Sequence, residues 1–247
     1  MIKGVINTVV SEPAILVKGL YKSFGDNSVL SNVDLTIDWG TQLTIFGSNG
    51  SGKTTLLKSL ALQCRVDDGS INIAGKDVYR DRSAIRQNIG VVGHQPMLYQ
   101  EMTCMENLIF FGRMYGVVGI AKRAQKILSE MGLERHSNDR VRNLSHGMQK
   151  RLAICRAIIH RPPILLMDEP ETGLDIRALE IVRSLIKSWT FKMGAVVITT
   201  HSIEVGLGWG SDVAILNNGA IVYRAKQEEV DQMWMRKTLL SNFGLTS

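Results

Sequence analysis

Short apolar segments rich in β-branched residues alternate along the chain with longer segments in which apolar residues recur every three or four positions. The short segments predict β-strands, and the longer ones predict amphipathic helices. This alternation is typical of a mostly parallel sheet with helices on its faces, so we expect an α/β fold. The segments expected to form strands are residues 14–17, 43–46, 70–73, 164–167 and 196–199.

Two further strand candidates lie near the end of the chain, at residues 213–216 and 221–223. The segment between them contains Asn217, Asn218 and Gly219. Asn and Gly tolerate the positive φ angles of a tight hairpin turn. We therefore expect these two strands to pair antiparallel to each other.

The stretch from about residue 105 to 160 has few strand candidates and shows helical periodicity throughout, which predicts a helical insertion. We expect a single domain over residues 1–247. Its core covers about 1–97 and 160–225, and its helical subdomain about 98–159. A C-terminal extension, about 226–247, includes a short helix whose Trp234 packs on the core or faces a partner. The apolar positions that mark the first two helices of the insertion are Leu108, Phe111, Tyr115, Ala124, Ile127, Leu128 and Met131.

Composition excludes several classes of protein. Apolar residues make up 45% and charged residues 21% of the chain, as in folded globular proteins. The longest apolar runs are far shorter than the roughly 18 residues of a membrane span, so we expect no spanning helix. Residues 1–6 hold a single Lys and no long apolar stretch, so we expect no secretory signal. Cys64, Cys104 and Cys155 are odd in number and form no Cys-x-x-Cys pair, which favours ordinary reduced thiols.

The net charge of +6 does not identify a partner. It would suit nucleic acid, an anionic nucleotide or the negatively charged face of a membrane. A well-solvated surface with a slight basic excess is the favoured explanation. Function must therefore be inferred from motifs.

A phosphate-binding loop is the strongest motif. Residues 47–54 fit the pattern G-x-x-x-x-G-K-[ST], follow an expected strand and precede an expected helix. Glycines let backbone N–H groups wrap around a phosphate, and the helix adds its positive N-terminal end. Lys53 is expected to reach the β- and γ-phosphates, and the Thr54 hydroxyl to bind Mg²⁺. The expected ATP-binding residues here are Gly47, Ser48, Asn49, Gly50, Ser51, Gly52, Lys53, Thr54 and Thr55.

Two acids end the expected strand at residues 164–167. Ligands of parallel sheets bind at the carboxyl ends of the strands, where Asp168 and Glu169 would lie. We expect Asp168 to contribute to the Mg²⁺ site and Glu169 to act as the general base that activates water. Seen alone, such a pair is more often a solvated turn or a helix cap, but the phosphate loop favours the functional interpretation.

A third segment carries a resemblance to a known family. Leu144, Ser145, His146, Gly147 and Met148 resemble the L-S-G-G-Q signature of the ABC transporter ATPases, with His and Met replacing the first Gly and the Gln. The serine and the second glycine suit the capped start of a helix beginning near residue 146, which is a further anion-binding site. The resemblance extends over about residues 15–223.

The resemblance implies roles for further residues. Phe24 is expected to stack on adenine, with Tyr21 as a close competitor. Gln95 resembles the glutamine that couples the metal site to the helical subdomain, so it is expected in both the catalytic and the metal-binding set. Asp175, after Gly173 and Leu174, resembles the D-loop aspartate, and His201 resembles the switch histidine that contacts the γ-phosphate. The other histidines, His94, His136, His146 and His160, are expected to be surface or packing residues.

The family resemblance also implies partners. Two chains would sandwich two ATP molecules with Mg²⁺, because Ser145 and Gly147 of one subunit complete the site of the other. A separate transmembrane permease is expected to dock near Gln95 and the helical insertion, which places the chain in the cytoplasm, bound peripherally to the cell membrane. Residues 96–99 and 103–116 look most like export ATPases, including the haem exporter of cytochrome c maturation. The cargo itself is decided in the membrane subunit.

Two other functions compete with transport. DNA-associated ABC ATPases of repair or chromosome organisation share the catalytic residues, but they carry long coiled coils or zinc modules between the Q-loop and the signature. This chain has only a short helical segment there, so no nucleic-acid partner is expected. A P-loop kinase for a small molecule explains Lys53 and Asp168 but gives no role to Ser145, Gly147 or His201.

Overall fold

The structure, a computed structural model, describes residues 12–243, so the expectation about a secretory signal concerns residues outside the described range. Within that range, six strands form a central sheet in the order β10-β9-β3-β8-β7-β6. Neighbours from β9 to β6 run parallel, whereas β10 is antiparallel to β9. The strands are β3 (Gln42–Phe46), β6 (Ile89–Val92), β7 (Ile164–Asp168), β8 (Ala195–Thr200), β9 (Asp212–Asn217) and β10 (Ala220–Lys226).

The central strands read as continuous apolar runs because they are buried on both faces. Every residue of β3, β7 and β8 is buried. This confirms the expected α/β class, and β9 and β10 form the antiparallel hairpin that the Asn-Asn-Gly turn predicts.

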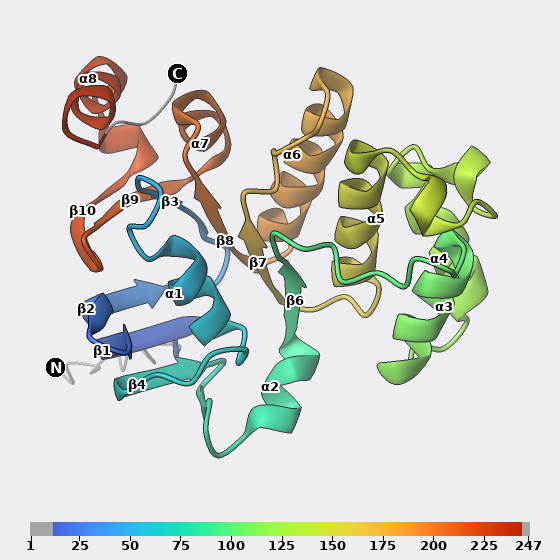
Figure 1. Ribbon diagram of the computed structural model, residues 1–247, viewed down its shortest axis with the longest axis horizontal. Coiled ribbons are helices and arrows are strands. Elements are labelled where there is room, and N and C mark those ends of the chain that lie inside the picture. Colours follow the sequence, from blue (N-terminus) through green and yellow to red (C-terminus); the bar gives the residue numbers. More distant parts are fainter. Residues whose placement is uncertain (1–11, 244–247) are drawn as a thin grey trace, which may run out of the picture.

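A second sheet, antiparallel throughout, packs beside the first (Figure 1). Its strand order in the described part of the chain is β2-β1-β4-β5. Sequence analysis predicted part of β1 and β4 but missed β2, although buried and exposed positions alternate along its second half. The strands are β1 (Ile15–Phe24), β2 (Asn27–Ile37), β4 (Asp68–Ile73) and β5 (Lys76–Asp77).

The helices divide into two groups. Three of them, α3 (Cys104–Met114), α4 (Ile120–Glu130) and α5 (His146–Ile158), gather at one side of the molecule (Figure 1) and share an apolar cluster with β6, β7 and β8. The others pack around the two sheets: α1 (Lys53–Leu60), α2 (Arg82–Asn88), α6 (Ile176–Phe191), α7 (Ile203–Trp209) and α8 (Gln232–Phe243). Short 3₁₀ turns are η1 (Glu134–His136), η2 (Val141–Asn143) and η3 (Gln227–Glu229).

The C-terminal helix α8 packs on the core through one face. Met235 and Leu239 are fully buried in a cluster that includes Phe46. The ring of Trp234 lies 5.5 Å from that of Tyr223 on β10 and is half exposed. Trp234 therefore covers the edge strand of the central sheet.

Across residues 12–243, none of the helices combines the length and the apolar character needed to cross a bilayer.

All three cysteines lie in the described part of the chain and are free thiols. Cys104 and Cys155 are buried in the helical cluster, and burial raises the pKa of the Cys104 thiol to about 11. Burial raises the pKa of Cys155 further. Both thiols are therefore protonated core residues, as expected for ordinary reduced cysteines.

The start of α3 is fixed by a capping box. The Thr103 hydroxyl accepts a hydrogen bond from the Glu106 N–H at 3.1 Å, and the Glu106 carboxylate accepts one from the Thr103 N–H at 2.8 Å. We expect Thr103→Ala to lower the free energy of unfolding by about 1 kcal/mol, because an orphan N–H loses its acceptor. Urea unfolding monitored by circular dichroism measures this. Thr103→Ser, which keeps the hydroxyl, should unfold near the wild-type midpoint, and equal losses in both variants would contradict the capping role.

Candidate active site

The phosphate loop joins β3 to α1 and has the shape that glycine permits. Gly50 and Gly52 have φ angles of 83° and 105°, which favour glycine. A Cβ on Gly52 would lie 2.7 Å from the Val29 carbonyl oxygen of β2, so a side chain cannot fit there. Gly52 is also the N-cap of α1, and no described side chain caps that helix. The first N–H groups of α1 are therefore available to an anion.

Lys53 lies in the centre of this loop. Its Nζ donates hydrogen bonds to the carbonyl oxygens of Gly47 at 2.7 Å and Ser48 at 3.0 Å. Burial lowers the pKa of Lys53 from its ordinary value, and the nearby carboxylates of Glu169 and Asp168 oppose that shift. A partly desolvated cation at this position attracts the negative charge of a polyphosphate strongly.

Asp168 connects three elements at the carboxyl end of β7. Its carboxylate accepts hydrogen bonds from the Thr54 hydroxyl of α1 at 2.9 Å and from the Thr199 hydroxyl of β8 at 2.6 Å. The β7–β8 register, which pairs Asp168 with Thr199, makes the second contact possible. Hydroxyl and carboxylate oxygens are ligands that Mg²⁺ accepts, and Mg²⁺ usually takes few protein ligands beside phosphate oxygens and water. The Thr54 and Asp168 pair fits such an ion.

Glu169 adopts a left-handed backbone conformation, with φ 45°, and its N–H donates to the Thr199 carbonyl at 3.0 Å. Its carboxylate lies 3.0 Å from Nδ1 of His201, the residue that follows β8. Both side chains retain access to solvent, with 21% of Glu169 and 39% of His201 exposed. The fold thus joins a carboxylate to an imidazole at the carboxyl edge of the sheet, within reach of water.

Two charged residues at this edge, one buried and one partly buried, were missed in the sequence. The Lys150 ammonium donates to the Asp168 carbonyl oxygen at 3.3 Å, and burial lowers its pKa. Glu171 accepts a hydrogen bond from the Thr200 hydroxyl, and burial raises its pKa. One signal was available: Lys150 stands four residues before Ile154, which places it on the core-facing side of α5.

The signature segment forms the start of α5, as expected. The Ser145 hydroxyl is the N-cap and accepts from the Met148 N–H at 3.3 Å. A Cβ on Gly147 would lie 2.7 Å from the Gly173 carbonyl oxygen, so the helix start packs directly on the loop between β7 and α6. Ser145 and His146 are exposed at this helix end.

The remaining predicted residues occupy separate positions. Gln95 is exposed, three residues beyond β6. Phe24 ends β1 with 55% of its surface exposed, and Lys22 Nζ lies 5.0 Å from its ring centroid. Tyr21 is 42% exposed. The Asp175 carboxylate caps α6 by accepting from the Ala178 N–H at 2.8 Å.

Comparisons with known proteins agree with this site. The family model described as "ABC transporter" matches residues 30–172, more than half of the chain. The chain belongs to the ABC transporter family. Like the other ATP-binding proteins of that family, this ABC ATPase hydrolyses ATP.

Several relatives are similar over most of the chain. The ABC transporter ATP-binding protein NatA of Bacillus subtilis (strain 168) is 36% identical over 202 residues, which cover 81% of this chain and 82% of NatA. The daunorubicin resistance ATP-binding protein DrrA3 of Streptomyces coeruleorubidus is 32% identical, covering 89% of this chain and 70% of that protein. A Nod factor export ATP-binding protein I of Ralstonia nicotianae is also 32% identical, covering 89% and 69%.

Solved structures show the same fold. A dimeric post-hydrolysis state of an ATP-binding cassette bound to ADP and Pi is similar with a TM-score of 0.80 and 30% identity, covering 86% of this chain and 98% of that one. The expected family, fold and ATPase activity are thereby confirmed. The haem-exporter resemblance gains no support from these relatives, two of which are named for daunorubicin resistance and Nod factor export.

Proposed function

We propose that this ABC ATPase powers the export of a compound through a separate transmembrane permease, to which it binds on the cytoplasmic face of the membrane. The ATPase part of the proposal rests on two side-chain contacts at one sheet edge beside the phosphate loop. The Glu169 carboxylate contacts the His201 imidazole, and the Thr54 hydroxyl donates to the Asp168 carboxylate. Export is supported by relatives named for Nod factor export and daunorubicin resistance.

ATP would bind with its phosphates on the loop of residues 47–55 and with Lys53 beside the β- and γ-phosphates. Adenine would stack on Phe24 rather than on Tyr21. Phe24 pairs with Asn27 at the tip of the β1–β2 hairpin. Val29, two residues farther along β2, packs against Gly52 of the phosphate loop. Tyr21 instead pairs with Asp68 of β4, on the side of β1 away from β2.

Mg²⁺ would be held by Thr54 and Asp168, with Gln95 approaching from the end of the neighbouring strand β6. The ion supplies charge neutralisation on the phosphate oxygens when bound. Lys150 and Thr199 keep the Asp168 peptide and carboxylate in place. These contacts orient the acid before any ligand arrives.

Hydrolysis requires a base beside the attacking water. Glu169 is the candidate because its carboxylate is accessible to solvent and oriented by His201 at 3.0 Å. The carboxylate would accept a proton from water as the water oxygen attacks the γ-phosphorus, and the bond from that phosphorus to the β–γ bridging oxygen would break to release ADP. The imidazole would orient the carboxylate and contact the γ-phosphate. Asp175, the N-cap of α6, would contribute to the ATP site from the loop that follows Glu169.

Two copies of the chain would assemble head to tail around two ATP molecules. Support comes from the capped start of α5, where Ser145 and His146 are exposed while Gly147 packs on the Gly173 loop. One related cassette has been solved as a dimer in two structures. Each copy would complete the other's site with this helix end.

Ser145→Asp tests the dimer. Aspartate is a good N-cap, so α5 should stay intact, but its negative charge would repel the γ-phosphate held by the other copy. We expect ATP binding by the monomer to be unchanged, while the ATP-dependent dimer is lost and hydrolysis falls at least about tenfold. Light scattering with and without ATP, beside a phosphate-release assay, measures this. A wild-type dimer in the variant would refute the role of Ser145.

The permease would dock where α3 meets the segment after β6. Exposed Met97, Tyr99 and Tyr115 lie there, and Arg156 holds the segment by donating to the carbonyl oxygens of Val91 at 2.6 Å and Met97 at 3.3 Å. Exposed apolar and aromatic side chains of this kind mark interaction surfaces.

The proposed function as a whole is tested by isolating the chain from membranes of its own cell. A co-purifying polytopic membrane protein that raises its ATPase rate, and that moves a compound outward in vesicles, is the expected result. Haem export for cytochrome c maturation remains a prediction that the same vesicles test with haem. An active chain that associates with no membrane protein would refute the transport function.

A further inference from the structure

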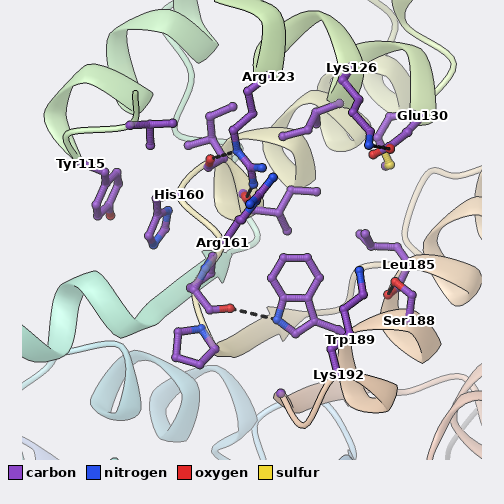
Figure 2. Close-up of a pocket in the computed structure, with 18 of the residues that line it drawn as sticks. Tyr115, Arg123, Lys126, Glu130, His160, Arg161, Leu185, Ser188, Trp189 and Lys192 are labelled. Atoms are coloured by element: carbon purple, nitrogen blue, oxygen red, sulfur yellow. Dashed lines mark hydrogen bonds and ion pairs between the residues drawn. The ribbon is translucent and has the colours of Figure 1, made fainter. Parts of the chain in front are cut away.

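A large groove lies at the end of β7 opposite the phosphate loop, and Figure 2 shows side chains that line it. Its walls are α4 and α6, and its end is the segment that joins α5 to β7. That segment precedes the first residue of β7, whereas Asp168 is the last, so the groove and the ATP site are at opposite ends of the strand. The groove has a volume of about 1690 Å³. Of the residues named above for catalysis and permease binding, Tyr115 alone lines it, at the border with the proposed permease surface.

Positive charge predominates along both walls. The basic side chains that line the groove are Lys122, Arg123, Lys126, Arg161, Arg177 and Lys192, against the acidic Glu130 and Glu180. Arg123 is engaged internally, since its guanidinium donates to the carbonyl oxygens at the end of α5, and Lys126 pairs with Glu130 at 3.7 Å. Lys122, Arg161, Arg177 and Lys192 form no ion pair among the described residues. The groove therefore presents uncompensated cations to solvent on both sides.

The base of the groove is apolar and aromatic. Trp189 lies in it with its indole N–H donated to the Pro162 carbonyl oxygen at 2.9 Å, so its polar edge is satisfied and its ring is left for packing (Figure 2). Leu185 and Ile181, one and two turns before it on α6, continue this surface. At the ends, Val118 is 97% and Met193 65% exposed. Apolar side chains in a concave site ringed by charge indicate an amphipathic ligand.

We propose that this groove binds an acidic amphipathic helix of a partner protein. Its volume exceeds the roughly 300–1000 Å³ of small-molecule pockets, and a groove between two helices suits a third helix about 10 Å across. Apolar side chains on one face of the ligand would pack on Trp189 and Leu185, and flanking Glu or Asp residues would pair with Lys122 and Lys192. A flat membrane would contact the rims but not the recessed indole.

The bound helix would touch two parts of the ATPase at once. One wall, α4, belongs to the helical group, and the other, α6, is capped at its start by Asp175, which follows the loop after β7. The occupant would thus hold α4 and α6 at a fixed distance. Met97 and Tyr99 of the proposed permease surface lie outside the groove lining, whereas Tyr115 belongs to both surfaces.

The test uses the full-length protein and a synthetic peptide. The peptide is a fluorescein-labelled helix of about 16 residues, about 24 Å long, with Leu on one face and Glu elsewhere. A second peptide carries Lys in place of every Glu. We expect saturable anisotropy for the acidic peptide alone, weakening as salt is raised because exposed charge pairs are screened.

Matched variants locate the binding site. The double variant Lys122→Glu/Lys192→Glu should weaken binding at least about tenfold, and Arg183→Glu/Lys187→Glu, exposed on α6 outside the groove lining, should not. The Ser184→Trp side chain would fill the groove, so this variant should not bind the acidic peptide. The Arg183→Trp variant, changed at the adjacent position outside the groove lining, should bind the peptide as the wild type does. Circular dichroism and wild-type ATPase rates verify that each variant is folded.

Three results would overturn the proposal. They are equal binding of the acidic and basic peptides, undiminished binding by the groove variants, and groove-dependent sedimentation with phosphatidylglycerol vesicles in the absence of peptide binding. The last would identify the groove as a membrane contact. Because ATPase activity is measured in parallel, a failure of groove binding leaves the proposed transport function separately testable.

Discussion

Replacing Glu169 by Gln is expected to lower the ATPase rate by about 10²- to 10⁴-fold, the usual contribution of a general base, while ATP still binds. The amide cannot accept the proton of the attacking water. It can still accept a hydrogen bond from His201, now 3.0 Å from the carboxylate, so the site should keep its shape. With ATP unhydrolysed, the proposed dimer should accumulate. Phosphate release, equilibrium nucleotide binding and gel filtration measure the three effects.

Glu171→Gln is the control for this prediction, because it removes a carboxylate two residues farther along the chain. Burial raises the pKa of Glu171, and its carboxylate accepts a hydrogen bond from the Thr200 hydroxyl that the Gln amide oxygen can also accept. We expect a loss of activity below about tenfold, the scale of one neutral hydrogen bond. A near-normal rate in the Glu169 variant, or a larger loss at Glu171, would move the base to another residue.

Lys53→Met is expected to weaken ATP binding about 10- to 100-fold, which corresponds to the loss of a charge-assisted hydrogen bond of about 1.5–3 kcal/mol. The nucleotide-free protein should not lose stability, because the methionine side chain removes a cation whose burial already lowers its pKa. Titration with a fluorescent ATP analogue and a thermal melt without nucleotide test the two statements together.

Lys58→Met supplies the matched control for this change. Lys58 is exposed on the same helix, one turn beyond the phosphate loop. The Lys58→Met variant should bind ATP with the affinity of the wild type. Equal losses in both variants would mean that the positive charge of α1 as a whole, rather than the position of Lys53, binds the phosphates.

The phosphate loop could be predicted because its chemistry is local. The residues that wrap a phosphate are contiguous, and positive φ angles at Gly50 and Gly52 require glycine whatever surrounds them. The acids of β7 could be predicted for a similar reason, since a buried strand must end at the sheet edge where ligands bind. The capped start of α5 at Ser145 likewise depends on a few neighbouring residues.

Other features depend on residues far apart in the sequence. Strand β2 was missed because its first residues are polar and its apolar face is defined only by pairing with β1. Lys150 and Glu171 could not be assigned to the site because they reach it only through the packing of α5 and of the loop after β7. In the fold, Lys150 contacts the Asp168 carbonyl and Glu171 lies near Glu169. The charged groove exists only because α4 and α6, some fifty residues apart, face each other.

The sequence by itself determined that this protein is an α/β ATPase with a phosphate loop, an acidic pair and a capped signature helix, because short-range backbone geometry and hydrophobic periodicity specify each of these. Only the tertiary structure decided that Glu169 meets His201 and that Asp168 meets Thr54 and Thr199. Those contacts come from the parallel register of β7 with β8 and from the position of α1 beside them. Every residue of β7 and β8 is buried and the two strands are joined through α6, so neither an alternating hydrophobic pattern nor a hairpin turn specifies their register in the sequence.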